Sequence, residues 1–336
     1  MNVLILGGTG LISTPMVSQF VERGDTVTVF NRAKREAKLP GGVRRIVGER
    51  YDHAAFVSQM QSAGTFDVVV EMIGYNGDDA RSLSNAFAGR IGQLIFCSTV
   101  DVYAKPATHY PYLENEVHHP IGRYAEGKVE AEAVLTEAHT RGDFPVTILR
   151  PAHTYSDSGT LIHSLGGATT YLDRLRKGKP IVVHGDGTSL WASCHAEDVA
   201  RAFVNASGNA HSHGHGYHLT GEEWLPWNTY HAVVAEAVGG PMPTLAHIPS
   251  ALLAKAAPER AGVCMANFQF TNIFDNAAAR AVLDFEQTIP FAEGAKRVVF
   301  HLDRVGGIVD SDTDPLDDRL IAAWQRLSAE FVEAIQ

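Results

Sequence analysis

The chain has 336 residues, of which 45% are hydrophobic and 20% charged, and its formal net charge is −10. This composition is typical of a soluble globular protein, and the acidic surplus argues against a general nucleic-acid binder. No apolar run approaches the roughly 18–20 residues that span a bilayer, and no signal-peptide pattern opens the chain, so we expect a cytoplasmic protein without membrane contact. Cys97, Cys194 and Cys264 are scattered, which argues against a disulfide framework.

Short apolar runs alternate with helical patterns over the first two hundred residues. The runs are apolar throughout, as in parallel strands covered on both faces. This alternation predicts βαβ units and an α/β fold with a Rossmann-type doubly wound parallel sheet. We expect strands at 3–6, 26–30, 67–72, 93–97 and 146–149, and helices at about 11–23, 53–62, 79–88 and 124–140.

The pattern becomes less regular after Arg150-Pro151, where Gly, Pro and Trp interrupt it. We therefore expect a dinucleotide-binding domain over 1–155, to which 181–206 returns. A smaller, mixed substrate-binding region is expected over 156–180 and 207–336, with a C-terminal amphipathic helix from about Asp317 to Gln336.

A glycine-rich turn stands at the first predicted strand-to-helix junction, in the run Gly7-Gly8-Thr9-Gly10-Leu11-Ile12-Ser13. Glycine allows a sharp turn and a close approach of a pyrophosphate, whose charge the N–H groups and dipole of the helix N-terminus stabilise. At this junction the turn indicates a dinucleotide site, and the alternative is a plain tight turn. We expect Gly7, Gly10, Leu11 and Ile12 to contact the cofactor.

The end of the second predicted strand bears on which dinucleotide is bound. An acidic residue there commonly accepts hydrogen bonds from the ribose of NAD. This chain has Asn31-Arg32 instead, with Lys34 and Arg35 close behind. Because arginine pairs with a 2′-phosphate, the sequence favours NADP(H) over NAD(H) by a small margin. For Lys34 and Arg35, a solvated basic turn is an equal alternative.

Tyr124 and Lys128 are spaced four residues apart in a predicted helix, which places both on one helical face. A lysine ammonium near a phenol favours the phenolate and lowers its pKa. Such a tyrosine can exchange a proton with a substrate hydroxyl or carbonyl while a nicotinamide exchanges hydride. The spacing is common by chance, so the pair gains weight only from its surroundings.

Further motifs accompany this pair in a consistent order. Ser98-Thr99-Val100-Asp101-Val102-Tyr103 ends the strand before it, and Leu149-Arg150-Pro151, Gly185-Asp186-Gly187 and Asp198-Val199-Ala200 follow. Together they resemble the extended short-chain dehydrogenase/reductase superfamily, in its NAD-dependent epimerase/dehydratase branch. The resemblance covers roughly residues 1–235, and the last hundred residues match only loosely.

The resemblance implies a role for each matching residue. Tyr124 is the acid/base, Lys128 holds the nicotinamide ribose and tunes Tyr124, and Thr99 hydrogen-bonds the reacting oxygen, with Ser98 as the fallback. Ser13 stands where the family often has a third glycine, which implies slightly looser helix packing. The remaining implied cofactor contacts are Asn31, Arg32, the backbone of Ile73 and Gly74, and Pro151 and His153 near the nicotinamide and the substrate mouth.

Two departures from the family pattern limit the substrate. Sugar-nucleotide dehydratases carry Thr-Asp-Glu where this chain has Thr99-Val100-Asp101, and valine cannot donate a proton, so dehydratase activity is disfavoured. Asp101 is then either a base or a turn residue. Trp191 replaces the arginine that clasps the diphosphate in nucleotide-sugar epimerases, so the substrate need not be a nucleotide sugar. Trp191, Trp224 and Trp227 form either an aromatic wall for the substrate or ordinary core packing.

We therefore expect an NAD(P)-dependent oxidoreductase or epimerase that acts on a secondary alcohol or ketone of a sugar-like or other small hydroxylated substrate. The alternative is a non-catalytic redox sensor or RNA-binding protein of the same fold. We expect no metal, because the tract His211-Ser212-His213-Gly214-His215 lacks a carboxylate or cysteine at useful spacing. We also expect no nucleic-acid partner, and a homodimer that pairs the helices at 79–88 and 124–140.

Overall fold

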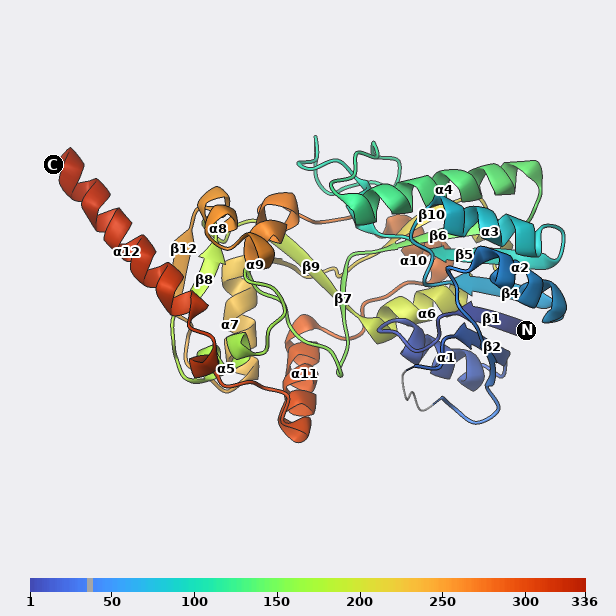
Figure 1. Cartoon of the computed structure of the whole chain (residues 1–336), viewed down its shortest axis with the longest axis horizontal. Coiled ribbons are helices and arrows are strands. Elements are labelled where there is room, and N and C mark those ends of the chain that lie inside the picture. Colours follow the sequence, from blue (N-terminus) through green and yellow to red (C-terminus); the bar gives the residue numbers. More distant parts are fainter. Residues whose placement is uncertain (35–38) are drawn as a thin grey trace. The chain divides into compact units, whose positions relative to one another are not determined.

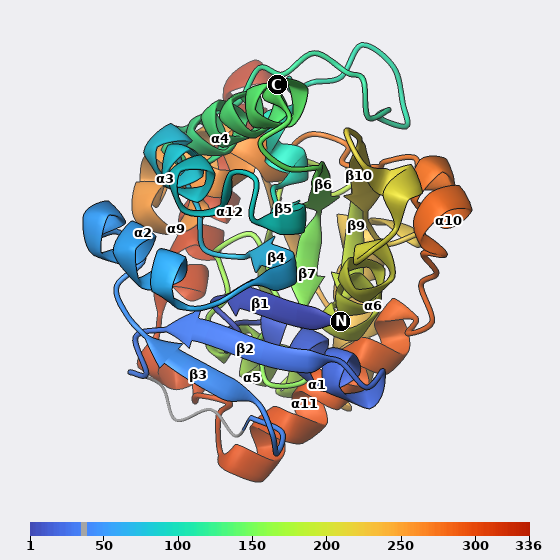
Figure 2. The ribbon, with the colours of Figure 1, turned by 90° about the vertical axis from the view of Figure 1, so that its right-hand side faces the viewer.

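The apolar runs of the N-terminal sequence form one parallel sheet in the computed structural model, which describes residues 1–34 and 39–336. The strands are β1 (Asn2–Leu6), β2 (Thr26–Asn31), β3 (Arg44–Val47), β4 (Phe66–Glu71), β5 (Ile91–Cys97), β6 (Val146–Pro151) and β10 (Gly216–Leu219). Their order across the 7-stranded sheet is β10-β6-β5-β4-β1-β2-β3 (Figure 2). The chain order reverses between β1 and β4, so the sheet is doubly wound, as predicted.

Helices cover both faces of this sheet, which explains why its strands are apolar throughout. One face packs against α1 (Ser13–Glu22), α6 (Ala196–Ala206) and α10 (Ala277–Leu283), through side chains such as Ile5 and Phe20. The other face packs against α2 (His53–Ser62), α3 (Gly77–Phe87) and α4 (Arg123–Arg141), through side chains such as Leu4 and Leu135. In Figure 1, α3 and α4 run side by side. Two short 3-10 turns, η1 (Val100–Val102) and η2 (Ala210–Ser212), complete this part.

The chain divides into two compact units, and this sheet belongs to unit 1, which comprises Met1–Thr154, Ser193–Gly221 and Phe274–Thr288. Unit 2 comprises Tyr155–Ala192, Glu222–Ile273 and Ile289–Gln336. Its core gathers aromatic side chains, among them Trp191, Trp227 and Phe268. Two strand pairs contribute to unit 2: β8 (Ile181–His184) is parallel to β12 (Leu245–Ile248), and β9 (Leu190–His195) is antiparallel to β11 (Trp224–Pro226).

The helices of unit 2 are interspersed with its strands along the chain. The last of them matches the expected C-terminal helix, and its first turns bury Ile321 while Trp324 packs against the core at its edge. Among the residues described, no helix is long and apolar enough to cross a membrane. The helices are α5 (Thr170–Arg176), α7 (Trp227–Ala237), α8 (Ser250–Ala256), α9 (Pro258–Val263), a π-helical turn η3 (Cys264–Phe268), α11 (Phe291–Val305), the turn η4 (Ser311–Thr313) and α12 (Leu316–Ile335).

The compact units divide the chain differently from the expected domains of 1–155 with 181–206, and 156–180 with 207–336. Residues 181–192 lie in unit 2, because β8 pairs with β12 rather than with the large sheet. Residues 207–221 lie in unit 1, because β10 adds to the sheet beside β6. Residues 274–288 follow them, since α10 packs on the same face as α6. The chain therefore passes between the units more often than its sequence indicates.

The short strand β7 (His153–Tyr155) and the strand β9 carry the chain from one unit to the other. Two strands of the large sheet, β10 and β3, were not among those expected for it, and the exposure of β3 explains why that strand was missed. Three of its four residues are exposed, because it lies at the edge of the sheet and pairs only with β2 among the described strands. An exposed edge strand lacks the apolar run that identifies the buried ones.

Candidate active site

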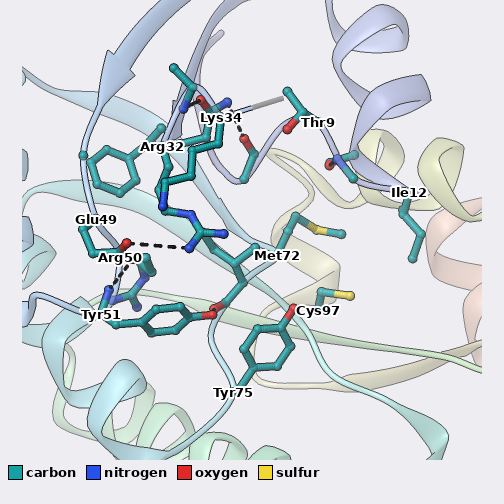
Figure 3. A pocket seen from close by; sticks show the side chains of 18 of the residues that line it. Thr9, Ile12, Arg32, Lys34, Glu49, Arg50, Tyr51, Met72, Tyr75 and Cys97 are labelled. Atoms are coloured by element: carbon teal, nitrogen blue, oxygen red, sulfur yellow. Dashed lines mark hydrogen bonds and ion pairs between the residues drawn. The ribbon is translucent and has the colours of Figure 1, made fainter. Parts of the chain in front are cut away.

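A cavity of about 450 Å³ opens in unit 1 at the carboxyl ends of the central strands (Figure 3). In a doubly wound sheet this edge is where ligands bind. Five segments line it: the glycine turn after β1, the chain after β2, the chain after β3, the chain after β4, and the end of β5. The lining residues are Gly7, Thr9, Gly10, Leu11, Ile12, Ser13, Phe30, Asn31, Arg32, Ala33, Lys34, Gly48, Glu49, Arg50, Tyr51, Met72, Ile73, Tyr75 and Cys97.

The glycine turn lies against β2 and opens α1. Gly8 has a φ of +85°, and a Cβ there would lie 2.6 Å from Cγ1 of Val29, so a side chain has no room. Ser13 does not loosen the packing as expected: its side chain is buried, and its Oγ accepts a 2.8 Å hydrogen bond from the amide of Gly10. Among the described residues, no side chain caps the N-terminus of α1, which leaves the helix end to a ligand.

The chain after β2 presents its polar side chains at the same cavity. The amide of Asn31 donates to the carbonyl oxygen of Gly7 at 3.0 Å, which ties the end of β2 to the glycine turn. Arg32 and Lys34 both line the cavity, and both side chains are exposed to water there. Arg35 lies outside the described residues. The predicted cofactor contacts Gly7, Gly10, Leu11, Ile12, Asn31, Arg32 and Ile73 thus share one cavity.

Sequence reasoning missed the chain after β3, which supplies Gly48, Glu49, Arg50 and Tyr51 to the cavity. The turn glycine Gly48, after the apolar pair Ile46-Val47, was the available signal. Arg50 is buried and donates through Nε to a carboxylate oxygen of Glu71 at 2.7 Å. The other carboxylate oxygen of Glu71 accepts from the amide of Ile73 at 2.7 Å. This buried ion pair fixes the loop after β4, where the cavity turns toward β5.

The tyrosine–lysine pair stands at the start of α4, beside the end of β5. Lys128 is buried, and its ammonium donates to the carbonyl oxygens of Gly74 at 2.8 Å and Cys97 at 2.6 Å. The ring centroids of Tyr75 and Tyr124 lie 6.2 Å apart, and the Lys128 ammonium lies 4.8 Å and 5.9 Å from them. Because Tyr75 and Cys97 also line the cavity, they join it to the pair.

Three successive residues of β5 and its end are tied to three turns of α4, an arrangement that we call the β5–α4 clasp. The Cys97 carbonyl accepts from Lys128, and the Thr99 side chain hydrogen-bonds to the Tyr124 phenol. Between them, the Ser98 hydroxyl donates to a carboxylate oxygen of Glu132. Of the two hydroxyl residues, Thr99 lies at Tyr124, whereas the hydroxyl of Ser98 is buried against Glu132.

The buried carboxylate of Glu132 is balanced by Arg150 of β6. Arg150 forms two hydrogen bonds with it, of 2.9 Å from Nε and 2.6 Å from a terminal nitrogen. The same guanidinium donates to the hydroxyl of Tyr103 at 2.8 Å, and that oxygen lies 2.6 Å from Nε2 of His218. This network connects the clasp to β6 and β10.

The pKa of Tyr124 lies above its ordinary value of 10.0, contrary to the expected lowering by Lys128. Partial burial of the phenol is the largest cause, the charges of Cys97 and Asp101 add to it, and the hydrogen bond with Thr99 opposes it. The Lys128 ammonium is directed at two carbonyl oxygens instead of the phenol oxygen. Burial also lowers the pKa of Lys128 itself. The phenol is therefore held in its protonated form at neutral pH.

The remaining predicted residues lie outside the lining of the cavity. Pro151 is buried in β6, and the ring of His153 lies 3.0 Å from Oγ of Ser193, with its pKa lowered to about 4 by burial. Asp101 accepts from the ammonium of Lys105 at 2.6 Å, so its carboxylate is already paired. Trp191 is buried in the core of unit 2, with its ring centroid 5.1 Å from that of Trp227.

A doubly wound parallel sheet with a glycine turn and a cavity at its carboxyl edge defines a Rossmann-type dinucleotide-binding protein. The model of the NAD dependent epimerase/dehydratase family matches residues 3–219, and the chain belongs to this family. The resemblance inferred from the tyrosine–lysine pair and its accompanying motifs is thereby confirmed.

Among others, two known proteins are similar in sequence to the chain. The chloroplast stem-loop binding protein of 41 kDa b of Arabidopsis thaliana is 29% identical over 259 residues, which cover 73% of this chain and 65% of that protein. The 2′-dehydrokanamycin reductase of Streptomyces kanamyceticus is 27% identical over 241 residues, 72% of this chain and 68% of that protein. The chain thus matches about two thirds of the length of these relatives.

Among solved structures, the UDP-glucose 4-epimerase of Thermotoga maritima, with UDP-glucose, has a TM-score of 0.72 and 19% identity. The match covers 91% of this chain and 99% of that one. At this identity the likeness shows a common fold.

Proposed function

We propose that this protein is an NAD(P)-dependent oxidoreductase or epimerase that interconverts a secondary alcohol and a ketone on a sugar-like or other small hydroxylated substrate. One observation carries the proposal. The β5–α4 clasp holds Thr99, Tyr124 and Lys128 together beside Tyr75 and Cys97, which line the cavity that begins at the glycine turn. Membership of the family supports the same chemistry.

The cavity residues fit a dinucleotide. The uncapped N-terminus of α1 offers amide groups to a pyrophosphate, and Gly8 lets the turn lie directly on β2. Arg32 and Lys34 offer cations at the end of β2, where the 2′ position of the adenosine ribose is recognised. This pair favours NADP(H) over NAD(H). A bound nicotinamide supplies or accepts the hydride of the reaction.

The side chains of the clasp perform the proton transfer. The protonated Tyr124 phenol donates to the oxygen of a substrate carbonyl, and in the reverse direction its oxygen accepts the proton of a hydroxyl. Thr99 shares a hydrogen bond with the phenol and positions the same oxygen. Lys128 stabilises the negative charge that remains on Tyr124, and its carbonyl partners hold it in place. Val100 and the paired Asp101 offer no second acid, so dehydration remains disfavoured.

The substrate class follows from the departures from the nucleotide-sugar pattern. Trp191 stands where those enzymes have a phosphate-binding arginine, and its burial suits packing more than a diphosphate contact. A substrate without a nucleotide fits this change, and the similarity to a 2′-dehydrokanamycin reductase agrees with it.

Substitution of Tyr124 tests the mechanism. Y124F removes the proton donor and leaves the cavity lining intact, so we expect dissociation constants for NADPH and NADH within about twofold of the wild type. Turnover of a ketone found in a substrate screen should fall by about 10²–10⁴-fold. Reduced-nicotinamide fluorescence measures both quantities. Unchanged turnover would remove Tyr124 from the mechanism, and absence of cofactor binding by the folded wild type would overturn the proposed function.

A second candidate function has a specific observation behind it, because one relative is named as a stem-loop binding protein. The net charge of −10 opposes it, since nucleic-acid affinity arises mainly from cations that neutralise phosphates. Gel-shift titration with stem-loop RNA at physiological salt decides. Micromolar or tighter binding, together with normal activity of Y124F, would favour this candidate.

The homodimer through α3 and α4 is likewise a proposal. Ala125 and Ala131 are buried within unit 1, which leaves the exposed Ala133 and the half-buried Val129 and Val134 for a second copy. Light scattering on the purified protein measures the mass and tests it.

A further inference from the structure

An ion pair lies in the part of the cavity that is proposed to recognise the 2′ position of the adenosine ribose. A terminal nitrogen of Arg32 lies 3.8 Å from a carboxylate oxygen of Glu49, and Figure 3 shows the guanidinium directed toward that carboxylate. Both side chains line the cavity, and both keep about half of their surface in water, with exposed fractions of 53% and 44%. The pair is therefore open to a ligand on one side.

The backbone brings these two side chains together. Strands β2 and β3 are in parallel register up to Asn31 and Val47, and the amide of Gly48 extends the ladder by donating to the carbonyl of Asn31 at 3.1 Å. Arg32 and Glu49 are the next residues on each side. Glu49 also accepts a weak 3.4 Å hydrogen bond from the amide of Tyr51, which holds its carboxylate over the cavity.

No other charge in the described lining takes the place of either partner. Arg50 is committed to Glu71, to the hydroxyl of Ser82 and to the carbonyl of Asp79. Lys34 is the remaining cation, and Glu49 is the one carboxylate among the lining residues. Among the described residues at this end of the cavity, the two cations Arg32 and Lys34 thus stand against one carboxylate.

We propose that Glu49 is a specificity-determining residue, whose carboxylate occupies the Arg32 guanidinium and must give way before a 2′-phosphate binds there. The inference rests on the proposed dinucleotide site. A ribose phosphate carries between one and two negative charges at neutral pH and competes with Glu49 for the same guanidinium. NADH lacks this phosphate and leaves the pair in place. Glu49 therefore narrows the preference for NADPH that Arg32 and Lys34 create.

The size of the effect of Glu49 on NADPH binding follows from the exposure of its ion pair with Arg32. A half-exposed ion pair is worth little in water, so the phosphate displaces Glu49 without a large penalty. The carboxylate then remains a few ångströms from a dianion, and that repulsion is screened but not abolished at ordinary salt. We expect its removal to tighten NADPH binding by about three- to tenfold.

The test is a fluorescence titration of the full chain with NADPH and with NADH, for the wild type and for E49Q. E49Q should lower the dissociation constant of NADPH by that factor and change that of NADH by less than twofold. E137Q is the matched control, because Glu137 forms an exposed pair with Arg141 at the same 3.8 Å on α4, away from the cavity. It removes the same charge and should leave both constants unchanged.

Substitution of Arg32 shows whether Glu49 acts through it. When Arg32 is already replaced, in R32Q, a further E49Q change should lower the dissociation constant of NADPH by less than half of the factor seen in the wild type. If both cofactors bind and E49Q behaves like E137Q, the role of Glu49 is overturned while the proposed function stands. If neither cofactor binds to the folded wild type, the proposed function fails, and the role of Glu49 fails with it.

Discussion

Gly127, between the proposed catalytic residues Tyr124 and Lys128, illustrates how a residue can act through its lack of a side chain. A Cβ on Gly127 would lie 2.1 Å from the carbonyl oxygen of Tyr75, a distance that no pair of such atoms tolerates. The absence of a side chain lets α4 approach the loop after β4, and this approach brings Lys128 within 2.8 Å of the carbonyl of Gly74. The glycine thus sets the distance between the helix and the cavity wall.

Replacing Gly127 tests this role. G127A should lower the free energy of unfolding by about 1–3 kcal/mol, because the overpacking exceeds the gain in helix propensity. The control is G41A, since a Cβ on Gly41 meets nothing within 4 Å, and its effect should stay within about 0.5 kcal/mol. Urea unfolding measures both. Equal effects of the two substitutions would mean that the close approach of α4 to the loop after β4 does not affect the free energy of unfolding.

At the scale of elements, the β5–α4 clasp positions Tyr124, the proposed acid/base. Tyr124, Lys128 and Glu132 stand on successive turns of α4, and each takes one residue of the sequence Cys97-Ser98-Thr99 as its partner. Two of these contacts involve Tyr124 and Lys128, the side chains of the proposed proton transfer. The third, from Ser98 to Glu132, joins the clasp to the guanidinium of Arg150 on the next strand.

Removal of Glu132 tests the clasp. E132A leaves the Arg150 guanidinium buried without its carboxylate partner, so the free energy of unfolding should fall by about 3–5 kcal/mol. S98A keeps the ion pair but loses one hydrogen bond to a charged group, so its free energy of unfolding should fall by about 1.5–3 kcal/mol. E137A on the exposed face of the same helix should change stability by less than about 0.5 kcal/mol. An E132A effect as small as that of E137A in urea unfolding would show that the network contributes nothing to the fold.

Over the whole molecule, buried histidines link stability to pH. His163 and His184 lie in unit 2 and His218 in unit 1, all at most 2% exposed. Burial lowers the pKa of His163 to about 3, of His184 to about 4 and of His218 to about 3, from an ordinary 6.5. Each ring is therefore neutral in the folded protein at any pH above about 4.

The expected pH dependence follows from the sign of these shifts. Below pH 6.5 these histidines bind protons in the unfolded chain but remain neutral in the folded protein. The stability present above pH 6.5 is therefore lost as the pH falls toward 4. Each histidine contributes about 1.4 kcal/mol per pH unit in that range. Urea unfolding between pH 7 and pH 5 measures how the free energy of unfolding changes with pH. H163Q should reduce this slope by the contribution of one histidine. A flat profile in the wild type would contradict the neutral buried histidines.

The sequence by itself determined the sheet and much of the cofactor cavity. Apolar runs, a glycine turn and a tyrosine–lysine spacing are local patterns, and each reflects a local requirement of backbone or helix geometry. The strands from β1 to β6, apart from β3, and the helices from α1 to α4 follow from them, as do Gly7, Gly10, Arg32 and the tyrosine–lysine helix.

The tertiary structure decided what depends on residues far apart in the chain. It placed Thr99 rather than Ser98 beside Tyr124, and it buried Trp191 in the core of unit 2. It assigned residues 207–221 and 274–288 to unit 1. It also brought Glu49 to Arg32, 17 positions earlier in the sequence, through the unpredicted strand β3. Hydrogen bonds and ion pairs between separate elements leave no periodic trace in the sequence, because each partner satisfies the pattern of its own element. Only the folded chain shows which partners meet.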